Sequence, residues 1–284
     1  MTCLYEGTVQ LPDGRRLGYG EYGRRGGVPV LFFHGAPGGR AFDVGREVAE
    51  HGLWVFVLER PGVGLSDRRP GATVLDWVGD VAGAADALGF ERFAVAGVSA
   101  GGRYALACGH GLPDRVTVAV LLSAWVVFAD EPHMDALLPE PFRSELQGYR
   151  SDPQGQLDAR CAEVRARCES WVRDPDGFHR EFFGAAADVV PPFWLQLLAA
   201  NYGGPLPSPV DFAEEYEPWG FSASEVSVPV RLWHGDADDS APLAMVEELV
   251  RRLPDGALTV CPGEGHFLHP KHRAEWMRVL AAAR

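Results

Sequence analysis

The segment Ala96-Gly97-Val98-Ser99-Ala100-Gly101-Gly102 decides the fold, because it places a serine between a strand pattern and a helix pattern. The apolar run Arg92–Ala96 before it predicts a buried strand, and the residues 103–108 after it predict a helix. A serine on such a sharp turn is lifted out of the sheet, above a helix N-terminus. A side chain at Gly97 or Gly101 would push the strand and the helix apart. The segment therefore predicts a nucleophile elbow at Ser99.

Apolar runs alternate with helical patterns along most of the chain. We expect strands near residues 5–11, 15–22, 28–33, 53–58, 92–98, 116–123, 228–233 and 257–261. We expect helices near residues 42–51, 73–88, 99–109, 241–253 and 266–283. Such alternation predicts an α/β fold with a mostly parallel sheet and helices on both of its faces.

The alternation is interrupted over residues 125–221, which are rich in aromatic residues. Helical patterns recur there at 134–149, 156–172 and 192–200. We expect a core domain formed by residues 1–124 and 222–284, with 125–221 as an inserted helical cap, or lid. This insertion is either an ordinary helical subdomain with a small core or a cover that lends apolar side chains to a substrate pocket, and the two interpretations are compatible.

Composition excludes several classes of function. The chain has 284 residues, of which 46% are hydrophobic and 23% charged, as in a globular protein. Its formal net charge of −13 argues against nucleic acid or an anionic membrane surface as a partner. We expect a small-molecule substrate, and a monomer or a homodimer. Lys271 is the single lysine, which argues against Schiff-base chemistry.

The N-terminal residues show neither the basic region nor the apolar region of a secretion signal, and no apolar run is long enough to span a bilayer. The five cysteines are scattered without metal-binding spacing, so we expect them to be reduced in a cytoplasmic protein without metal or cofactor. His266, His269 and His272 recur every third residue, but no acidic or cysteine pattern accompanies them. We expect His269 and His272 to face outward rather than to bind a metal.

A glycine-rich loop, His34-Gly35-Ala36-Pro37-Gly38-Gly39, directly follows the strand pattern 28–33. Such a loop can bring backbone N–H groups close to a substrate oxygen. Ala100 lies in the first turn of a helix, where the N–H has no partner within the helix. We expect Ala36 and Ala100 to donate to an oxyanion, and His34, Gly35 and Trp125 to contact the substrate. The alternative for this loop is a plain tight turn.

The remaining parts of a catalytic site follow two later strand patterns. Asp238 lies in the loop after residues 228–233, and His266 follows the strand that ends at Cys261. A serine hydroxyl needs an imidazole to take its proton, and the imidazole needs a carboxylate to orient it. The order Ser99, Asp238, His266 is that of a hydrolase triad. Asp236 and Asp239 lie on the same loop, as alternative acids or as turn and helix-cap residues.

Together these motifs resemble the α/β-hydrolase superfamily along nearly the whole chain, and most closely bacterial serine hydrolases with an HGxPG loop. Arg60-Pro61-Gly62-Val63-Gly64-Leu65-Ser66-Asp67 matches a loop of that family, and Ser123-Ala124-Trp125 lies where its cap departs. The resemblance implies an eight-stranded core with an antiparallel second strand. It also implies Ser99 as nucleophile, His266 as base, Asp238 as acid, and Ala36 and Ala100 as oxyanion donors.

The resemblance leads us to expect a carboxylesterase-like serine hydrolase that cleaves an ester or a related acyl bond. Proline iminopeptidases have a similar His34–Gly39 loop, but they place Gly and Trp beside the serine, where this chain has Val98 and Ala100. Cleavage of an amide, thioester or carbon–carbon bond and acyl transfer remain open. A ligand-binding or biosynthetic protein that does not hydrolyse its ligand is a further alternative.

Overall fold

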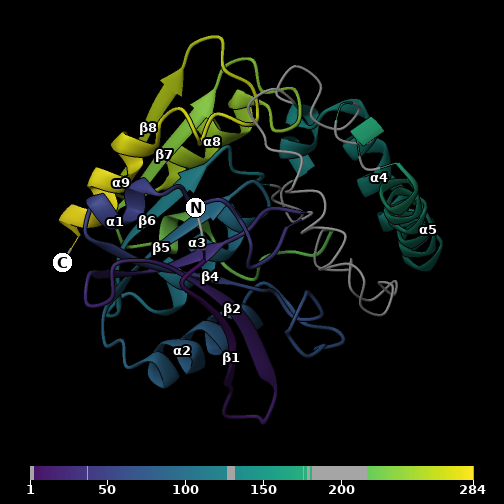
Figure 1. Cartoon of the computed structure of the whole chain (residues 1–284). Helices are drawn as coiled ribbons and strands as arrows, with labels where there is room; N and C mark the ends of the chain where they lie inside the picture. Colours follow the sequence, from purple (N-terminus) through teal and green to yellow (C-terminus); the bar gives the residue numbers. More distant parts are fainter. Residues whose placement is uncertain are drawn as a thin grey trace.

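Eight strands form one sheet in the computed structural model, in the order β1-β2-β4-β3-β5-β6-β7-β8 (Figure 1). The structure describes residues 3–36, 38–126, 132–174, 176–177, 180 and 216–283. The strands are β1 (Tyr5–Gln10), β2 (Arg16–Gly23), β3 (Val28–Phe33), β4 (Leu53–Leu58), β5 (Phe93–Val98), β6 (Val116–Leu122), β7 (Val230–Gly235) and β8 (Gly256–Cys261). β2 runs antiparallel to its neighbours β1 and β4, and all other pairs of adjacent strands are parallel. The expected α/β sheet with an antiparallel second strand is therefore confirmed.

Helices cover both faces of this sheet, because the central strands are apolar on both sides. Along β3, Leu31 and Phe33 belong to one core with α2 (Asp76–Leu88), α3 (Gly101–Gly111) and α8 (Leu243–Arg252). Val30 and Phe32 belong to the opposite core with α1 (Glu47–Glu50) and α9 (Arg273–Ala282). Figure 1 shows α1 and α9 together on one side of the sheet.

The carboxyl ends of five neighbouring strands meet along one edge of the sheet. Phe33 of β3 pairs with Gly97 of β5, and Gly235 of β7 pairs with Cys261 of β8. The N–H of Ser99 donates to the carbonyl of Leu122 at 2.9 Å, which continues the pairing of β5 with β6 beyond the strand end. The loops that follow these strands therefore lie side by side, where ligands bind in open α/β sheets.

The helix expected at 42–51 forms only over Glu47–Glu50. Asp43 accepts a hydrogen bond from the N–H of Gly45 at 3.0 Å, and Gly45 has a φ of 87°. This side-chain turn and the left-handed glycine interrupt the helical pattern, because they hold the backbone in a turn.

The last helix begins at Arg273 rather than at the expected residue 266. His269, expected to face outward, is buried: its ring lies 5.1 Å from that of Phe42, centroid to centroid. Its carbonyl accepts a hydrogen bond from the indole N–H of Trp276 at 3.1 Å. The expectation was wrong because the segment before α9 folds back into the core instead of continuing the helix.

The inserted region contains the 3₁₀ turn η1 (Pro132–Leu137) and the helices α4 (Glu140–Ser151) and α5 (Pro153–Arg173), which extend to one side of the sheet in Figure 1. The short turn η5 (Ala223–Glu225) follows the insertion. α4 and α5 agree with an inserted helical cap, whereas the helix expected at 192–200 lies outside the described residues. The limits 125 and 221 stay a prediction. No helix within the described ranges combines the length and the apolar composition that a membrane span requires.

The two glycines of the elbow stand where the backbone of α3 approaches the sheet. A Cβ on Gly97 would collide with the carbonyl of Gly101 and come within 2.9 Å of the N of Gly102. A Cβ on Gly101 would collide with the carbonyl of Phe33 and lie 3.0 Å from that of His34. The expected steric role of both glycines is therefore confirmed, and it extends to β3 as well as β5.

Two buried histidines are kept neutral by their surroundings. Burial, together with the positive charge of Arg60, lowers the pKa of His34 to about 3. Burial, together with the positive charge of Arg273, lowers the pKa of His269 to about 3. A histidine of the unfolded chain titrates near pH 6.5, so only the unfolded state takes up protons just below that pH.

We predict that Gly101→Ala destabilises the fold by roughly 1–3 kcal/mol, because the new methyl group meets backbone that cannot move aside. Gly79 in α2 is the matched control, since a Cβ added there would meet nothing within 4 Å. Gly79→Ala should stabilise the protein by up to about 1 kcal/mol through helix propensity. Urea denaturation of the three proteins measures both changes. Equal effects of the two substitutions would contradict the steric account.

We also predict that the free energy of unfolding falls as the pH is lowered from about 7 to about 5.5. Each buried neutral histidine contributes a loss of up to about 1.4 kcal/mol per pH unit, because the unfolded state gains a proton that the folded state refuses. His269→Leu removes one such histidine and should reduce the slope. Denaturant titrations at several pH values test this, and an unchanged slope in the variant would refute it.

Candidate active site

Ser99 occupies a strained turn between β5 and α3. Its φ is 52°, in the left-handed region that residues other than glycine rarely adopt. The turn is held because the carbonyl of Ser99 accepts hydrogen bonds from the N–H groups of Gly102 and Trp125, both at 3.0 Å. The side chain of Ser99 remains partly exposed at the edge formed by the strand ends. The surrounding structure therefore holds the hydroxyl out of the sheet.

Ser99, His266 and Asp238 form a continuous chain of hydrogen bonds. The Oγ of Ser99 lies 3.0 Å from Nε2 of His266, and Nδ1 of His266 lies 2.8 Å from Oδ2 of Asp238. A carboxylate can only accept, so Nδ1 carries the ring proton and Nε2 is left to accept the hydroxyl proton of Ser99. The structure thus brings together three residues that the sequence places far apart, in the tautomer that a general base needs.

The carboxylate of Asp238 is buried and has hydrogen bonds on both oxygens. Its side chain is 0% exposed, and Oδ1 accepts from the N–H groups of Ser240 at 3.0 Å and Ala241 at 2.8 Å. These bonds offset the cost of removing the charge from water. They also leave Oδ2 directed at His266.

The two other aspartates of this loop, Asp236 and Asp239, are exposed. Asp236 is exposed and accepts a hydrogen bond from the N–H of Gly263 at 2.7 Å, which ties the loop after β7 to the loop after β8. Asp239 is exposed, and α8 begins after Pro242 without a side-chain cap. Of the three aspartates, Asp238 is the one whose hydrogen bond to His266 the structure records.

The loops that carry Asp238 and His266 are in backbone contact with each other. The N–H of Ala237 donates to the carbonyl of Glu264 at 3.1 Å. A Cβ on Gly235 would collide with that same carbonyl, so glycine is required at the end of β7. Close packing of the two loops fixes the distance between the carboxylate and the imidazole.

The side chain of His34 lies inside the protein rather than at the surface of the site. It is 0% exposed; Nδ1–H donates to the carbonyl of Gly35 at 2.7 Å, and Nε2 accepts from the N–H of Arg60 at 3.4 Å. Both ring nitrogens are therefore used within the protein. The imidazole therefore supports the loop from inside the protein, and the contact of His34 with a substrate stays a prediction.

The backbone after His34 does reach the serine. A Cβ on Gly35 would lie 3.2 Å from the Cβ of Ser99 and 3.8 Å from its Oγ. Ala36 follows as an exposed residue, while Ala100 is the N-cap of α3 and is buried. Neither N–H of these alanines has a recorded backbone acceptor among the described residues. Their role as oxyanion donors stays a prediction.

Trp125 adjoins the site through its backbone and the inserted region through its ring. Its N–H donates to the carbonyl of Ser99, and its ring lies 4.4 Å from that of Phe142 in α4, centroid to centroid. The backbone at the start of the insertion is therefore tied to the elbow, and its first aromatic ring packs against α4. The contact of Trp125 and Gly35 with a substrate stays a prediction.

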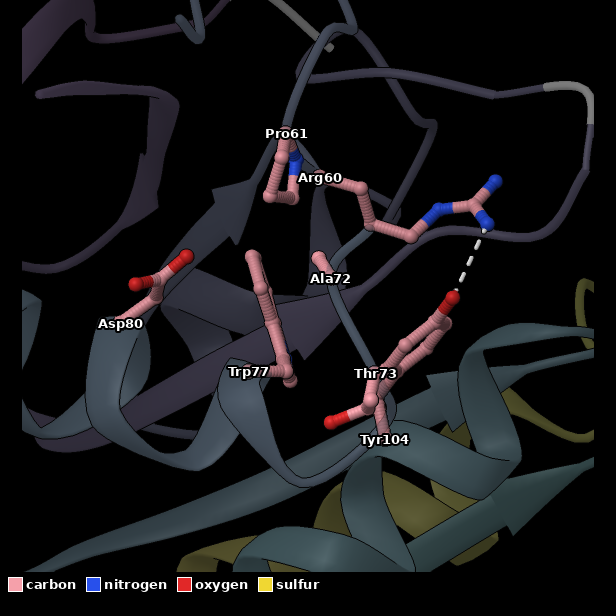
Figure 2. A pocket seen from close by; sticks show the side chains of 7 residues that line it. All are labelled: Arg60, Pro61, Ala72, Thr73, Trp77, Asp80 and Tyr104. Atoms are coloured by element: carbon pink, nitrogen blue, oxygen red, sulfur yellow. Dashed lines mark hydrogen bonds between the residues drawn. The ribbon is translucent and has the colours of Figure 1, made fainter. Parts of the chain in front are cut away.

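A small pocket lies near the loop that follows β3, between α2, α3 and the segment after β4 (Figure 2). Figure 2 shows the side chain of Arg60 extending to the hydroxyl of Tyr104, at 3.3 Å. The ring of Tyr104 packs edge-on against Trp77 at 5.8 Å. The pocket is lined by Arg60, Pro61, Ala72, Thr73, Trp77, Asp80 and Tyr104, and none of these belongs to the Ser99–His266–Asp238 chain. Tyr104 therefore packs from α3 against Trp77 of α2 and against Arg60.

One histidine beside the site was not singled out from the sequence. His234 is fully buried at the end of β7, and its Nε2 lies 3.4 Å from Oδ2 of Asp238. A signal was present: His234-Gly235 ends a strand, as His34-Gly35 follows one. Within the described residues, no group of three histidine, cysteine, aspartate or glutamate side chains could hold a metal ion.

Comparisons with known proteins agree with the fold. The chain is 29% identical over 254 residues to a non-heme chloroperoxidase of Streptomyces lividans, covering 84% of each chain. It is 31% identical over 288 residues to a probable proline iminopeptidase of Leptolyngbya boryana, covering 88% of this chain and 84% of the relative. A thermophilic esterase from Thermogutta terrifontis superposes with a TM-score of 0.62 at 23% identity, over 98% of this chain and 97% of the esterase. Residues 28–272 match the family described as alpha/beta hydrolase fold, and the chain therefore belongs to the α/β-hydrolase family.

Proposed function

We propose that this protein is a serine hydrolase that cleaves a carboxylic ester or a related acyl bond of a small, partly apolar molecule. The observation that carries the proposal is the chain of hydrogen bonds from Ser99 Oγ through His266 to Asp238, with distances of 3.0 and 2.8 Å. An alcohol side chain in such a chain can lose its proton to the imidazole as it attacks a carbonyl carbon.

The first half of the reaction transfers the acyl group to the protein. Ser99 Oγ forms a bond to the carbonyl carbon while His266 Nε2 takes the hydroxyl proton. The tetrahedral intermediate collapses when the bond from carbon to the alcohol oxygen breaks, and His266 returns its proton to the departing alcohol. Asp238 remains ionised and stabilises the imidazolium that exists between the two proton transfers.

The second half regenerates the serine. A water molecule gives a proton to His266 and attacks the acyl carbon, and the bond to Ser99 Oγ breaks as that oxygen recovers the proton. The products are a carboxylic acid and an alcohol. In both halves the negative oxygen would accept hydrogen bonds from the N–H groups of Ala36 and Ala100. Each such donor contributes roughly 3–4 kcal/mol to transition-state stabilisation.

The surroundings of Ser99 favour a substrate with an apolar portion. Trp125 and Phe142 pack against each other where the insertion leaves the sheet, and the N–H of Trp125 donates to the carbonyl of Ser99. An apolar acyl or alcohol group bound there would be removed from water, at a gain of about 25 cal/mol per Å² of buried surface. Gly35 leaves room on the other side of Ser99, because it has no side chain.

A second candidate is an aminopeptidase of the proline iminopeptidase kind. It is favoured by the relative of Leptolyngbya boryana, which is 31% identical and matches 88% of this chain. The same three residues would then cleave an amide bond instead of an ester. The neighbours of the serine, Val98 and Ala100, differ from the Gly and Trp typical of that family and make the ester the first candidate.

Labelling with an alkyl fluorophosphonate tests the proposal without knowledge of the natural substrate. We predict that the reagent modifies Ser99, that Ser99→Ala abolishes the modification, and that the wild-type protein hydrolyses short p-nitrophenyl esters with a burst. Intact-mass and peptide mass spectrometry locate the adduct. Absence of any adduct would reject the hydrolase and favour a ligand-binding protein, whereas release of proline from a proline naphthylamide would favour the aminopeptidase.

Substitution of the three aspartates tests the assignment of the acid. We predict that Asp238→Asn lowers kcat by a factor on the order of 10⁴, because the amide favours the wrong tautomer of His266. Asp236→Asn retains an oxygen for the N–H of Gly263, and Asp239 is exposed, so both of these variants should keep most of the activity. Steady-state ester hydrolysis measures the ranking. A larger loss in Asp236→Asn or Asp239→Asn than in Asp238→Asn would refute the assignment.

A further inference from the structure

His234 lies beneath the loop that presents Asp238. It stands four residues before the aspartate, at the carboxyl end of β7, and is 0% exposed. Its Nε2 lies 2.7 Å from the carbonyl oxygen of Ala241 and 3.4 Å from Oδ2 of Asp238. Nε2 of His234 therefore faces both ends of the segment 238–241.

The hydrogen-bond partners define the protonation of this ring. A carbonyl oxygen only accepts, so Nε2 of His234 carries a proton and donates it to Ala241. Nδ1 is buried and has no hydrogen-bond partner among the described residues. Burial lowers the pKa of His234, while the Ala241 carbonyl and the charge of Asp238 oppose that shift. The ring is therefore neutral, because a second proton on Nδ1 would have no acceptor.

Two hydrogen bonds connect His234 with the acid through Ala241. His234 Nε2–H donates to the carbonyl of Ala241, and the N–H of Ala241 donates to Oδ1 of Asp238 at 2.8 Å. The other oxygen, Oδ2, accepts from His266 Nδ1 at 2.8 Å. A change in the position of Ala241 therefore changes the direction in which Asp238 faces His266.

We propose that His234 is a positioning residue that orients Asp238 toward His266, by fastening the Ala241 peptide beneath the carboxylate. The inference rests on the proposed function, since it concerns the same site. A residue at the end of a buried strand needs only to pack, and an apolar side chain could do so. The polar ring of His234 is therefore explained by the hydrogen bond that it donates.

Neutrality of the ring is part of this role. A positive His234 would stand 3.4 Å from the same Oδ2 that must stabilise the imidazolium of His266, and the two cations would compete for it. The titratable groups that interact with the ring of His234 are Asp238 on its own loop and His266 on the loop after β8, while the thiol of Cys261 on β8 meets the backbone of His234. His266 in turn faces Asp238, Ser99 and His269.

The test compares His234→Leu, His234→Gln and His234→Asn with the wild-type protein. The amide nitrogen of Gln can occupy the place of Nε2 and donate to Ala241, whereas the shorter Asn cannot reach that carbonyl. The readout is the rate of Ser99 labelling by an alkyl fluorophosphonate as a function of pH, which needs no natural substrate.

We expect His234→Leu and His234→Asn to be labelled about 10- to 100-fold more slowly on the pH plateau, because a displaced carboxylate orients the base poorly. The midpoint of the acidic limb should move to lower pH, since a misdirected Asp238 stabilises protonated His266 less well. His234→Gln should restore most of the rate and the midpoint. His110→Leu is the control, a histidine that stacks on Phe221 and has no recorded contact with the acid loop or with His266 among the described residues, and it should leave both quantities unchanged.

A second readout separates this inference from the proposed function. The proton resonance of His266 Nδ1–H reports its hydrogen bond to Asp238 even in a protein without activity. We expect it to move upfield in His234→Leu and His234→Asn and to return in His234→Gln. Wild-type labelling rates and an unchanged resonance in the Leu and Asn variants would overturn the inference. Failure of the wild-type protein to be labelled at all would reject the hydrolase instead, and the resonance would still decide the role of His234.

Discussion

The close approach of helix α3 to the ends of β3 and β5 is the constraint on which the site depends. Gly97 and Gly101 allow backbone to meet backbone there, and a methyl group at either position would collide with a carbonyl. The same approach forces Ser99 into a left-handed conformation, at a cost of about 1–3 kcal/mol that the surrounding sheet must offset. In return, the hydroxyl stands clear of the sheet and next to an N-terminal helix turn, where free N–H groups favour negative charge.

Buried polar groups hold the loops around this serine. Each of the two His-Gly pairs, His34-Gly35 and His234-Gly235, places a neutral imidazole beneath a loop and bonds it to a carbonyl of that loop, at 2.7 Å in both cases. An imidazole suits this purpose because it is flat enough to pack in the core and still donates a hydrogen bond. Below the unfolded histidine's usual pKa, the same burial makes the fold sensitive to acid, since the folded rings do not accept protons.

The site balances exposure against burial along one chain of hydrogen bonds. The carboxylate of Asp238 is buried and accepts three hydrogen bonds, His266 is 15% exposed, and Ser99 is partly open to the edge. The carboxylate is therefore held where the dielectric is low and its effect on the imidazole is strong, while the hydroxyl of Ser99 stays accessible. Backbone hydrogen bonds between the loops after β7 and β8 hold the three side chains in this arrangement.

The sequence alone determined the α/β sheet and its central strands, and it predicted that Ser99, His266 and Asp238 would meet, because strand patterns and turn glycines are local signals. It failed where tertiary contacts decide: the turn at Asp43–Gly45 shortened α1, and packing against Phe42 drew His269 inward. It also did not indicate that the rings of His34 and His234 are buried and hydrogen-bonded to loop carbonyls. Only the folded structure decided where these rings lie, because burial depends on residues that are distant in the chain.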